Sequence, residues 1–108
     1  MGKPLLVLEA ARTVVDEVDT LILSRRQLLS RDQLAEAAGS IAANIREGFG
    51  RREGRERNQF LRYARASSEE TDEFLRANHR QELIGPTQYW RLHNRIALIV
   101  RMLNRLMG

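Results

Sequence analysis

Apolar residues recur at intervals of three and four along four segments of the chain, which is the spacing of amphipathic helices. The segments cover residues 4–24, 30–49, 55–81 and 86 onwards, and none alternates apolar and polar positions as a strand does. Short connections between four helices predict an all-α fold, an antiparallel up-down-up-down four-helix bundle. The length of 108 residues suits a single domain, residues 1–108, with one core.

Turn and capping residues place the ends of these helices. Ser30 and Gln33 have the spacing of a capping box, which predicts that the second helix starts there, after a connection formed by residues 25–29. Pro86 suits a first helical position, because the N–H that proline lacks would have no partner there. The second helix is expected to end at three glycines: Gly48, Gly50 and Gly54.

The predicted buried faces differ in character. The second helix is rich in alanine, and the third has an unusually polar face that includes Ser68, Thr71 and Asn78. The apolar stripes of the first and fourth helices are wider than one bundle needs, which predicts association with further copies of the chain. The fourth helix carries a regular stripe at Tyr89, Leu92, Ile96, Ile99, Leu103 and Leu106.

Polar side chains form a second row on each of the two middle helices. One row contains Ser40, Asn44 and Glu47, and the other contains Tyr63, Ser67 and Glu70. If these helices are antiparallel neighbours, the rows face each other and form a hydrogen-bonded strip. The alternative is that both rows face water. The first interpretation predicts a structural polar network of Ser40, Asn44, Glu47, Ser67 and Glu70.

Candidate catalytic or metal-binding residues are few. The chain has no cysteine, and its two histidines, His79 and His93, fall on different predicted helices, where we expect solvated or capping imidazoles. The glycines at 48 and 50 lack the Lys and Ser/Thr of a phosphate-binding loop. The acidic run at residues 69–73 is expected to pair with Arg65 and Arg76 on a solvated face. These observations predict a protein without enzymatic activity, cofactor or metal.

Basic side chains suggest a partner. The net charge of +4 comes almost entirely from arginine, and residues 46–65 alone hold seven arginines against three glutamates. Guanidinium groups beside the start of a helix suit phosphate, and the shortage of aromatic residues among them favours contact with the backbone of RNA or DNA over base readout. The alternatives are an ordinary solvated loop, and a scaffold that binds an acidic protein. The predicted nucleic-acid-binding residues are Arg46, Arg51, Arg52, Arg55 and Arg57.

The start of the chain meets charged residues too early for a signal peptide, and no segment is long and apolar enough to span a membrane. With no cysteine, the sequence gives no sign of an oxidising compartment. We therefore expect a cytoplasmic protein without a membrane partner.

Two spaced motifs in the middle of the chain resemble a known family. The first runs from Ser40 through Asn44 to Arg51, and the second from Phe60 to Glu70. They are similar to those of the four-helix-bundle family first noticed as open reading frames in intervening sequences of bacterial 23S ribosomal RNA genes. That family is in turn similar to the accessory variability protein of diversity-generating retroelements.

The resemblance implies an antiparallel four-helix bundle that assembles into a barrel-shaped homopentamer with a positively charged surface for RNA or DNA. The Asn and Glu of the family's first motif correspond to Asn44 and Glu47, and the Ser and Glu of its second motif to Ser67 and Glu70. This chain departs from the pattern at Ala66, where the family usually has Gly, and at Arg46, where it often has Ala; the second departure adds charge.

Overall fold

The computed structural model describes residues 3–24 and 27–108, and these form four α-helices and no strand. The helices are α1 (Lys3–Ser24), α2 (Arg31–Phe49), α3 (Arg55–Arg80) and α4 (Pro86–Met107). The prediction of an all-α chain of four helices is confirmed, and Pro86 occupies the first turn of α4 as expected. Residues 25 and 26 of the predicted first connection lie outside the described residues.

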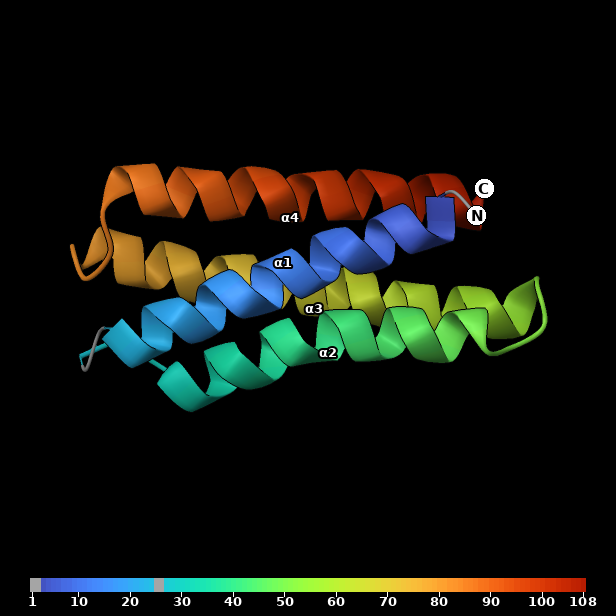
Figure 1. The fold of residues 1–108 in the computed structure, drawn as a ribbon, viewed down its shortest axis with the longest axis horizontal. Coiled ribbons are helices and arrows are strands. Elements are labelled where there is room, and N and C mark those ends of the chain that lie inside the picture. The colour runs from blue at the N-terminus through green and yellow to red at the C-terminus, as the bar shows by residue number, and fades with distance from the viewer. Residues whose placement is uncertain (1–2, 25–26) are drawn as a thin grey trace.

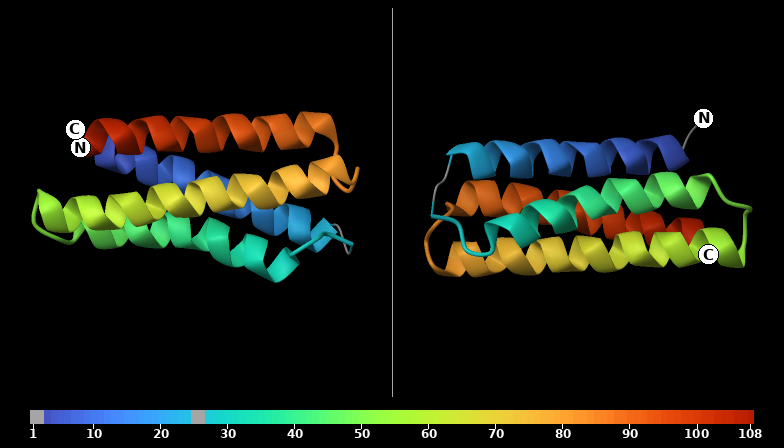
Figure 2. Two further views of the ribbon diagram at one scale, coloured as in Figure 1. Left: turned by 180° about the vertical axis from the view of Figure 1, so that it is seen from behind. Right: turned by 90° about the horizontal axis from the view of Figure 1, so that it is seen from below.

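The four helices pack side by side into an elongated molecule of 42 × 22 × 19 Å. In Figure 1 the start of α1 and the end of α4 lie at the same end of the bundle as the α2–α3 connection. Each helix contacts the helix that follows it, and α4 returns to contact α1. Among the described residues α2 makes no contact with α4, and Figure 2 shows these two helices on opposite sides of the bundle.

The core consists of the stripes that the sequence predicts. On α4 the five residues from Tyr89 to Leu103 in the heptad stripe are at most 3% exposed, and Leu106 packs partly against them. Three of the seven buried residues of α2 are alanines, and the larger ones are Leu34, Ile41 and Ile45. Each fully buried Val or Leu contributes about 1.5–3 kcal/mol through removal of apolar surface from water. On α1 the residues with no exposed surface are Val7, Ala11, Val14, Val18 and Leu21.

The polar face of α3 is buried and its side chains are hydrogen-bonded. The hydroxyl of Ser68 donates to the carbonyl of Ala64 at 2.8 Å, and the hydroxyl of Thr71 donates to the carbonyl of Ser67 at 2.7 Å. Burying a hydroxyl is tolerated because each finds an acceptor one turn back in its own helix. The polar face predicted for the third helix therefore packs inward without leaving these two groups unpaired.

Asn78 joins α3 to the segment that precedes α2. Its Oδ1 accepts a hydrogen bond from the Leu29 N–H at 2.7 Å, and its Nδ2 donates to the Leu29 carbonyl at 3.1 Å and to the Phe74 carbonyl at 2.8 Å. The side chain has no exposed surface. One buried amide thus satisfies both backbone groups of a residue 49 positions away.

The predicted capping box at the start of α2 is wrong. Ser30 has the left-handed backbone angles φ 51° and ψ 40° and makes no side-chain capping hydrogen bond. A capping Ser normally has extended backbone angles, which aim its hydroxyl at the first free N–H groups. Here the preceding residue, Leu29, is held by Asn78, and the chain enters α2 through a tight turn instead. None of the four helices is long and apolar enough to cross a membrane.

Candidate nucleic-acid interface at the α2–α3 connection

The connection between α2 and α3 is short and its shape depends on glycine. The N–H of Gly50 donates to the carbonyls of Arg46 and Glu47, both at 3.1 Å, and closes α2. Gly54 has a φ of 113°, which side chains other than hydrogen rarely tolerate, and α3 begins directly after it without a side-chain cap. Residues 51–54 therefore form a tight bend that carries arginines at positions 51 and 52.

Gly48 allows the two helices to approach closely beside this bend. A Cβ atom at position 48 would lie 3.2 Å from Cδ2 of Leu61 and 3.3 Å from Cβ of Phe60. These distances are shorter than ordinary van der Waals contact, so a larger residue would push α2 and α3 apart. Gly48 lies inside α2 and packs against α3, whereas the sequence suggested only that it ends the helix.

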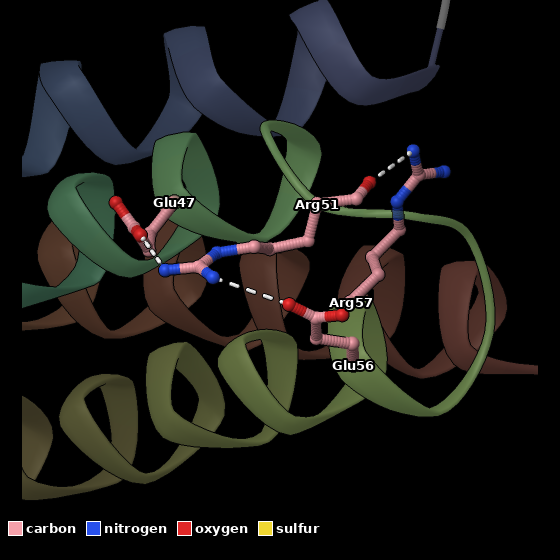
Figure 3. Close-up of polar contacts among 4 residues, drawn as sticks. All are labelled: Glu47, Arg51, Glu56 and Arg57. Atoms are coloured by element: carbon pink, nitrogen blue, oxygen red, sulfur yellow. Dashed lines mark hydrogen bonds and ion pairs between the residues drawn. The ribbon is translucent and has the colours of Figure 1, made fainter.

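Arg51 is held between two carboxylates. Its guanidinium lies 2.5 Å from the Glu47 carboxylate and 3.1 Å from the Glu56 carboxylate (Figure 3). The same guanidinium lies over the ring of Phe60. The hydrogen bond with Glu47, and after it the one with Glu56, raises the pKa of Arg51 above its usual value. Arg51 therefore bridges the end of α2 and the start of α3.

Arg57 folds back onto the bend. Its Nη2 donates to the backbone carbonyl of Arg51 at 3.3 Å, and its guanidinium lies 4.8 Å from the centre of the Phe49 ring (Figure 3). Its Nε is buried and has no partner among the described residues. Arg57 is thus also engaged by the protein itself.

The other three predicted arginines project into solvent. Arg46, Arg52 and Arg55 are exposed, and none of them makes an ion pair or a side-chain hydrogen bond within residues 3–24 and 27–108. The structure thus divides the five predicted residues into two groups. Arg51 and Arg57 fix the shape of the bend, and Arg46, Arg52 and Arg55 remain available to an anion.

The end of α4 brings further arginines to this end of the bundle. Asn58 Nδ2 donates to the Met107 carbonyl at 3.4 Å, and Arg65 donates to Asn104 Oδ1 at 2.8 Å. Arg65 was expected to pair with the acidic run on its own helix, and that expectation is wrong. On α4, Arg105 follows Asn104 directly, whereas Arg101 lies one turn earlier and lines a groove together with Glu69 of α3. Neither arginine is among the predicted nucleic-acid-binding residues, although α4 has four arginines and no acidic residue.

Three of the five residues predicted to form a polar network meet between α2 and α3. Ser67 Oγ donates to Ser40 Oγ at 2.9 Å, and Asn44 Nδ2 donates to the hydroxyl and carbonyl oxygens of Ser40, both at 2.9 Å. The link between the helices is therefore Ser40, while Asn44 bonds within its own helix. Glu47 points to Arg51 instead, and Glu70 is exposed without a polar partner among the residues described.

A second polar cluster lies between α3 and α4, and of its contacts only the predicted pairing of Arg76 with the acidic run, through Asp72, was expected. His93 Nδ1 lies 2.9 Å from Asp72 Oδ1, and Arg76 lies 2.9 Å from Asp72 Oδ2, so both oxygens of this nearly buried carboxylate are paired. The hydrogen bond with the Tyr89 hydroxyl and then the charge of Asp72 raise the pKa of Arg76. His79 stacks on the ring of Tyr89. The two histidines are thus part of the packed structure, which corrects the expectation of solvated or capping imidazoles.

Comparisons with known proteins agree with this fold. No curated protein matches the sequence. A crystal structure of a protein of unknown function from the S23 ribosomal protein family of Bacteroides thetaiotaomicron is similar in fold, with a TM-score of 0.85, 24% sequence identity and 97% of each chain covered. Residues 3–105 match the family described as 23S rRNA-intervening sequence protein. Because this match spans nearly the whole sequence, the chain belongs to the 23S rRNA-intervening sequence protein family.

Proposed function

We propose that this chain is a non-enzymatic, cytoplasmic, oligomeric protein that binds the phosphate backbone of RNA or DNA at the α2–α3 connection. The observation that carries the proposal is the exposure of Arg46, Arg52 and Arg55 without an ion-pair partner among the described residues. Two of the three nearby glutamates, Glu47 and Glu56, are both bound to Arg51 and do not screen these arginines directly. The family description refers to 23S rRNA, which makes RNA the first partner to test.

Assembly would strengthen such binding. Phosphate contacts through single arginines are weak and salt-sensitive, and repetition of the same surface in an oligomer raises the effective affinity. The resemblance noted above implies a ring of five antiparallel bundles, and five copies of a chain with net charge +4 carry a total of +20. Exposed apolar side chains support association, since Leu23 is 86%, Leu6 53% and Trp90 51% exposed. Light scattering that finds a monomer would contradict the assembly.

The test is a titration of RNA and duplex DNA across salt concentrations. A variant with Arg46→Ala, Arg52→Ala and Arg55→Ala loses three potential phosphate contacts. For duplex DNA the slope of log K against log salt is expected to become shallower by up to about 2.7, at about 0.9 per contact.

The matched control removes the same charge elsewhere. Arg12, Arg31 and Arg80 are also exposed, and Arg31 and Arg80 lie at the end of the bundle opposite the bend. Their triple Ala variant has the same net charge as the test variant. Equal slopes for the two variants would show that only overall charge matters and would remove the proposed site.

A scaffold that binds another protein is the second candidate. The exposure of Leu23 and Trp90, both large and apolar, favours it. The two functions differ in their response to nuclease. If affinity capture recovers one protein in fixed proportion and nuclease treatment leaves its recovery unchanged, the scaffold function replaces nucleic-acid binding.

A further inference from the structure

A groove runs between α3 and α4 on the outside of the bundle. Its volume is about 230 Å³, and it is lined by apolar and polar side chains together. Ile96, Ala97 and Val100 of α4 supply the apolar part. This is smaller than the volume of about 300 Å³ or more that a drug-sized ligand occupies, so the groove suits a single planar ring system. The polar lining residues are Glu69, Asp72, His93 and Arg101.

This groove lies between the middle parts of α3 and α4, and Arg101 stands on its side towards the basic end of the molecule. Arg101 lines it directly, and the hydrogen bond from Arg65 to Asn104 places a second guanidinium one turn further along. Residues 46–65 and 101–108 together hold nine arginines and three glutamates, a balance of +6. Because the whole chain carries +4, the remaining residues carry −2. An anionic ligand attracted to the basic end would meet the groove at its border.

The polar groups inside the groove suit a neutral, hydrogen-bonding ring. Asp72 is already paired through both oxygens, with His93 and with Arg76. Because a carboxylate only accepts, His93 Nδ1 carries the proton of their hydrogen bond. Glu69 is exposed and adds further acceptor oxygens. These acceptors match the ring and exocyclic N–H groups of a nucleobase, while Arg101 matches a phosphate.

The other two grooves described lack this combination. One lies between α2 and α3 and contains two carboxylates, those of Glu36 and Glu70, and no cation. The other lies between α1 and α4, and its Arg91 is already paired with Glu17. Of these three grooves, the α3–α4 groove alone joins an apolar surface to a guanidinium without a partner among the described residues.

We propose that the α3–α4 groove accepts an unpaired base of a single-stranded nucleic acid, whose adjoining phosphate lies on Arg101. The inference rests on the proposed function and extends it, since it specifies single strands as the preferred substrate class. In a duplex the bases are stacked and paired, so they cannot enter the groove, whereas bases of a single strand can turn outward. A basic surface followed by a place for a base is the usual arrangement in proteins that bind single strands.

The only tryptophan of the chain reports on this groove. Trp90 is half exposed and packs edge to face on His93, with 5.3 Å between the ring centres. A base beside His93 is expected to change Trp90 fluorescence. We would titrate the protein with a short single-stranded RNA, with a DNA of the same sequence and with the duplex of that DNA. Both single strands are expected to shift the fluorescence, and the duplex to bind without shifting it.

A substitution that fills the groove tests the same point. Ala97→Leu adds bulk at a partly exposed position and is expected to lower the affinity for single strands about tenfold, the effect of losing one base contact, with duplex affinity unchanged. Ala43→Leu is the matched control, because Ala43 is exposed on α2, which does not contact α4. Arg101→Gln, at an exposed position, is expected to weaken single-strand binding as well.

The results separate this inference from the proposed function. If single strands leave Trp90 fluorescence unchanged, and Ala97→Leu and Arg101→Gln bind them as tightly as Ala43→Leu does, the groove is not a base site. The proposed function survives that outcome provided that the triple variant at the connection still loses affinity. If RNA and DNA single strands both shift the fluorescence, the shared base and phosphate chemistry is sufficient; if only RNA does, the ligand is RNA.

Discussion

Replacement of Asn78 tests whether a single buried amide fixes how the chain enters α2. Asn78→Ala removes two hydrogen bonds to the backbone of Leu29, at 2.7 and 3.1 Å, and one to the Phe74 carbonyl. The side chain has no exposed surface, so water cannot replace it without a change in packing. The N–H and C=O of Leu29 then lose partners that lie 49 residues away in the sequence.

The expected loss follows from the two long-range bonds. Each contributes about 0.5–1.5 kcal/mol net, which gives about 2 kcal/mol for the pair. Leu29 is 44% exposed, so its backbone groups can recover some hydration and the full penalty for buried unpaired groups does not apply. For a chain of this size a loss of about 2 kcal/mol lowers the melting temperature by about 8–16 °C.

Urea denaturation followed by circular dichroism measures this loss, at one protein concentration because association stabilises the folded state. Glu73→Ala, at an exposed position of the same helix, is the control and should change the free energy of unfolding by less than about 0.5 kcal/mol. Asn78→Asp should be worse than Asn78→Ala at neutral pH, because an oxygen then faces the Leu29 and Phe74 carbonyls. If Asn78→Ala and the control have the same stability, the hydrogen bonds of Asn78 with Leu29 do not stabilise the fold.

Three further changes test other parts of the structure. Gly48→Ala is expected to destabilise the bundle, because the new Cβ would lie 3.2 Å from Leu61 Cδ2. Gly39→Ala is the control: its Cβ meets no atom within 4 Å, and it should stabilise the bundle by about 0.5–1 kcal/mol. If urea denaturation shows that Gly48→Ala also stabilises the bundle, α2 and α3 do not approach as closely as described. Asp72→Ala should lower the urea midpoint more than Glu73→Ala does, since it deprives His93 and Arg76 of their shared acceptor; equal midpoints would show that the cluster adds no stability. Arg51→Ala should change the free energy of unfolding little, because the ion pairs of Arg51 are exposed. It should weaken nucleic-acid binding without altering the dependence of the affinity on salt. An altered salt slope would mean that Arg51 itself contacts phosphate.

The helices could be predicted because their signals are local. The three-and-four spacing on α4 needs only the sequence of that helix, and the residues it marks from Tyr89 to Leu103 are the buried ones. The start of α2 shows the limit of such signals. Ser30 and Gln33 satisfy a local rule, but the hydrogen bonds of Leu29 with Asn78 come from a distant part of the chain and set a different backbone conformation.

The sequence was sufficient to locate the candidate site, but not to tell the arginines that contact the protein itself from those that are exposed and free. Residues 46–65 stand out by their arginine content alone. Which arginines are free depends on contacts across the bend, such as that of Arg51 with Glu56, and these follow from the angle at which α3 leaves it. The approach of the end of α4 to α3, seen in the hydrogen bonds from Asn58 to Met107 and from Arg65 to Asn104, is a property of the packed bundle, so no local pattern indicates it.

Under the proposed function, the division among the arginines would give the bend a physical basis for recognition. A guanidinium on a flexible loop loses conformational entropy when it binds, and that loss offsets part of the contact energy. Here Gly54, the two carboxylates around Arg51, and the contact of Arg57 with Phe49 hold the backbone of the bend in place before any ligand arrives. Arg52 and Arg55 are therefore attached to a fixed backbone, and only their side chains must be ordered on binding. Two arginines that contact no phosphate would in this way increase the affinity of the exposed ones, which is why a count of positive charges alone does not identify the binding residues.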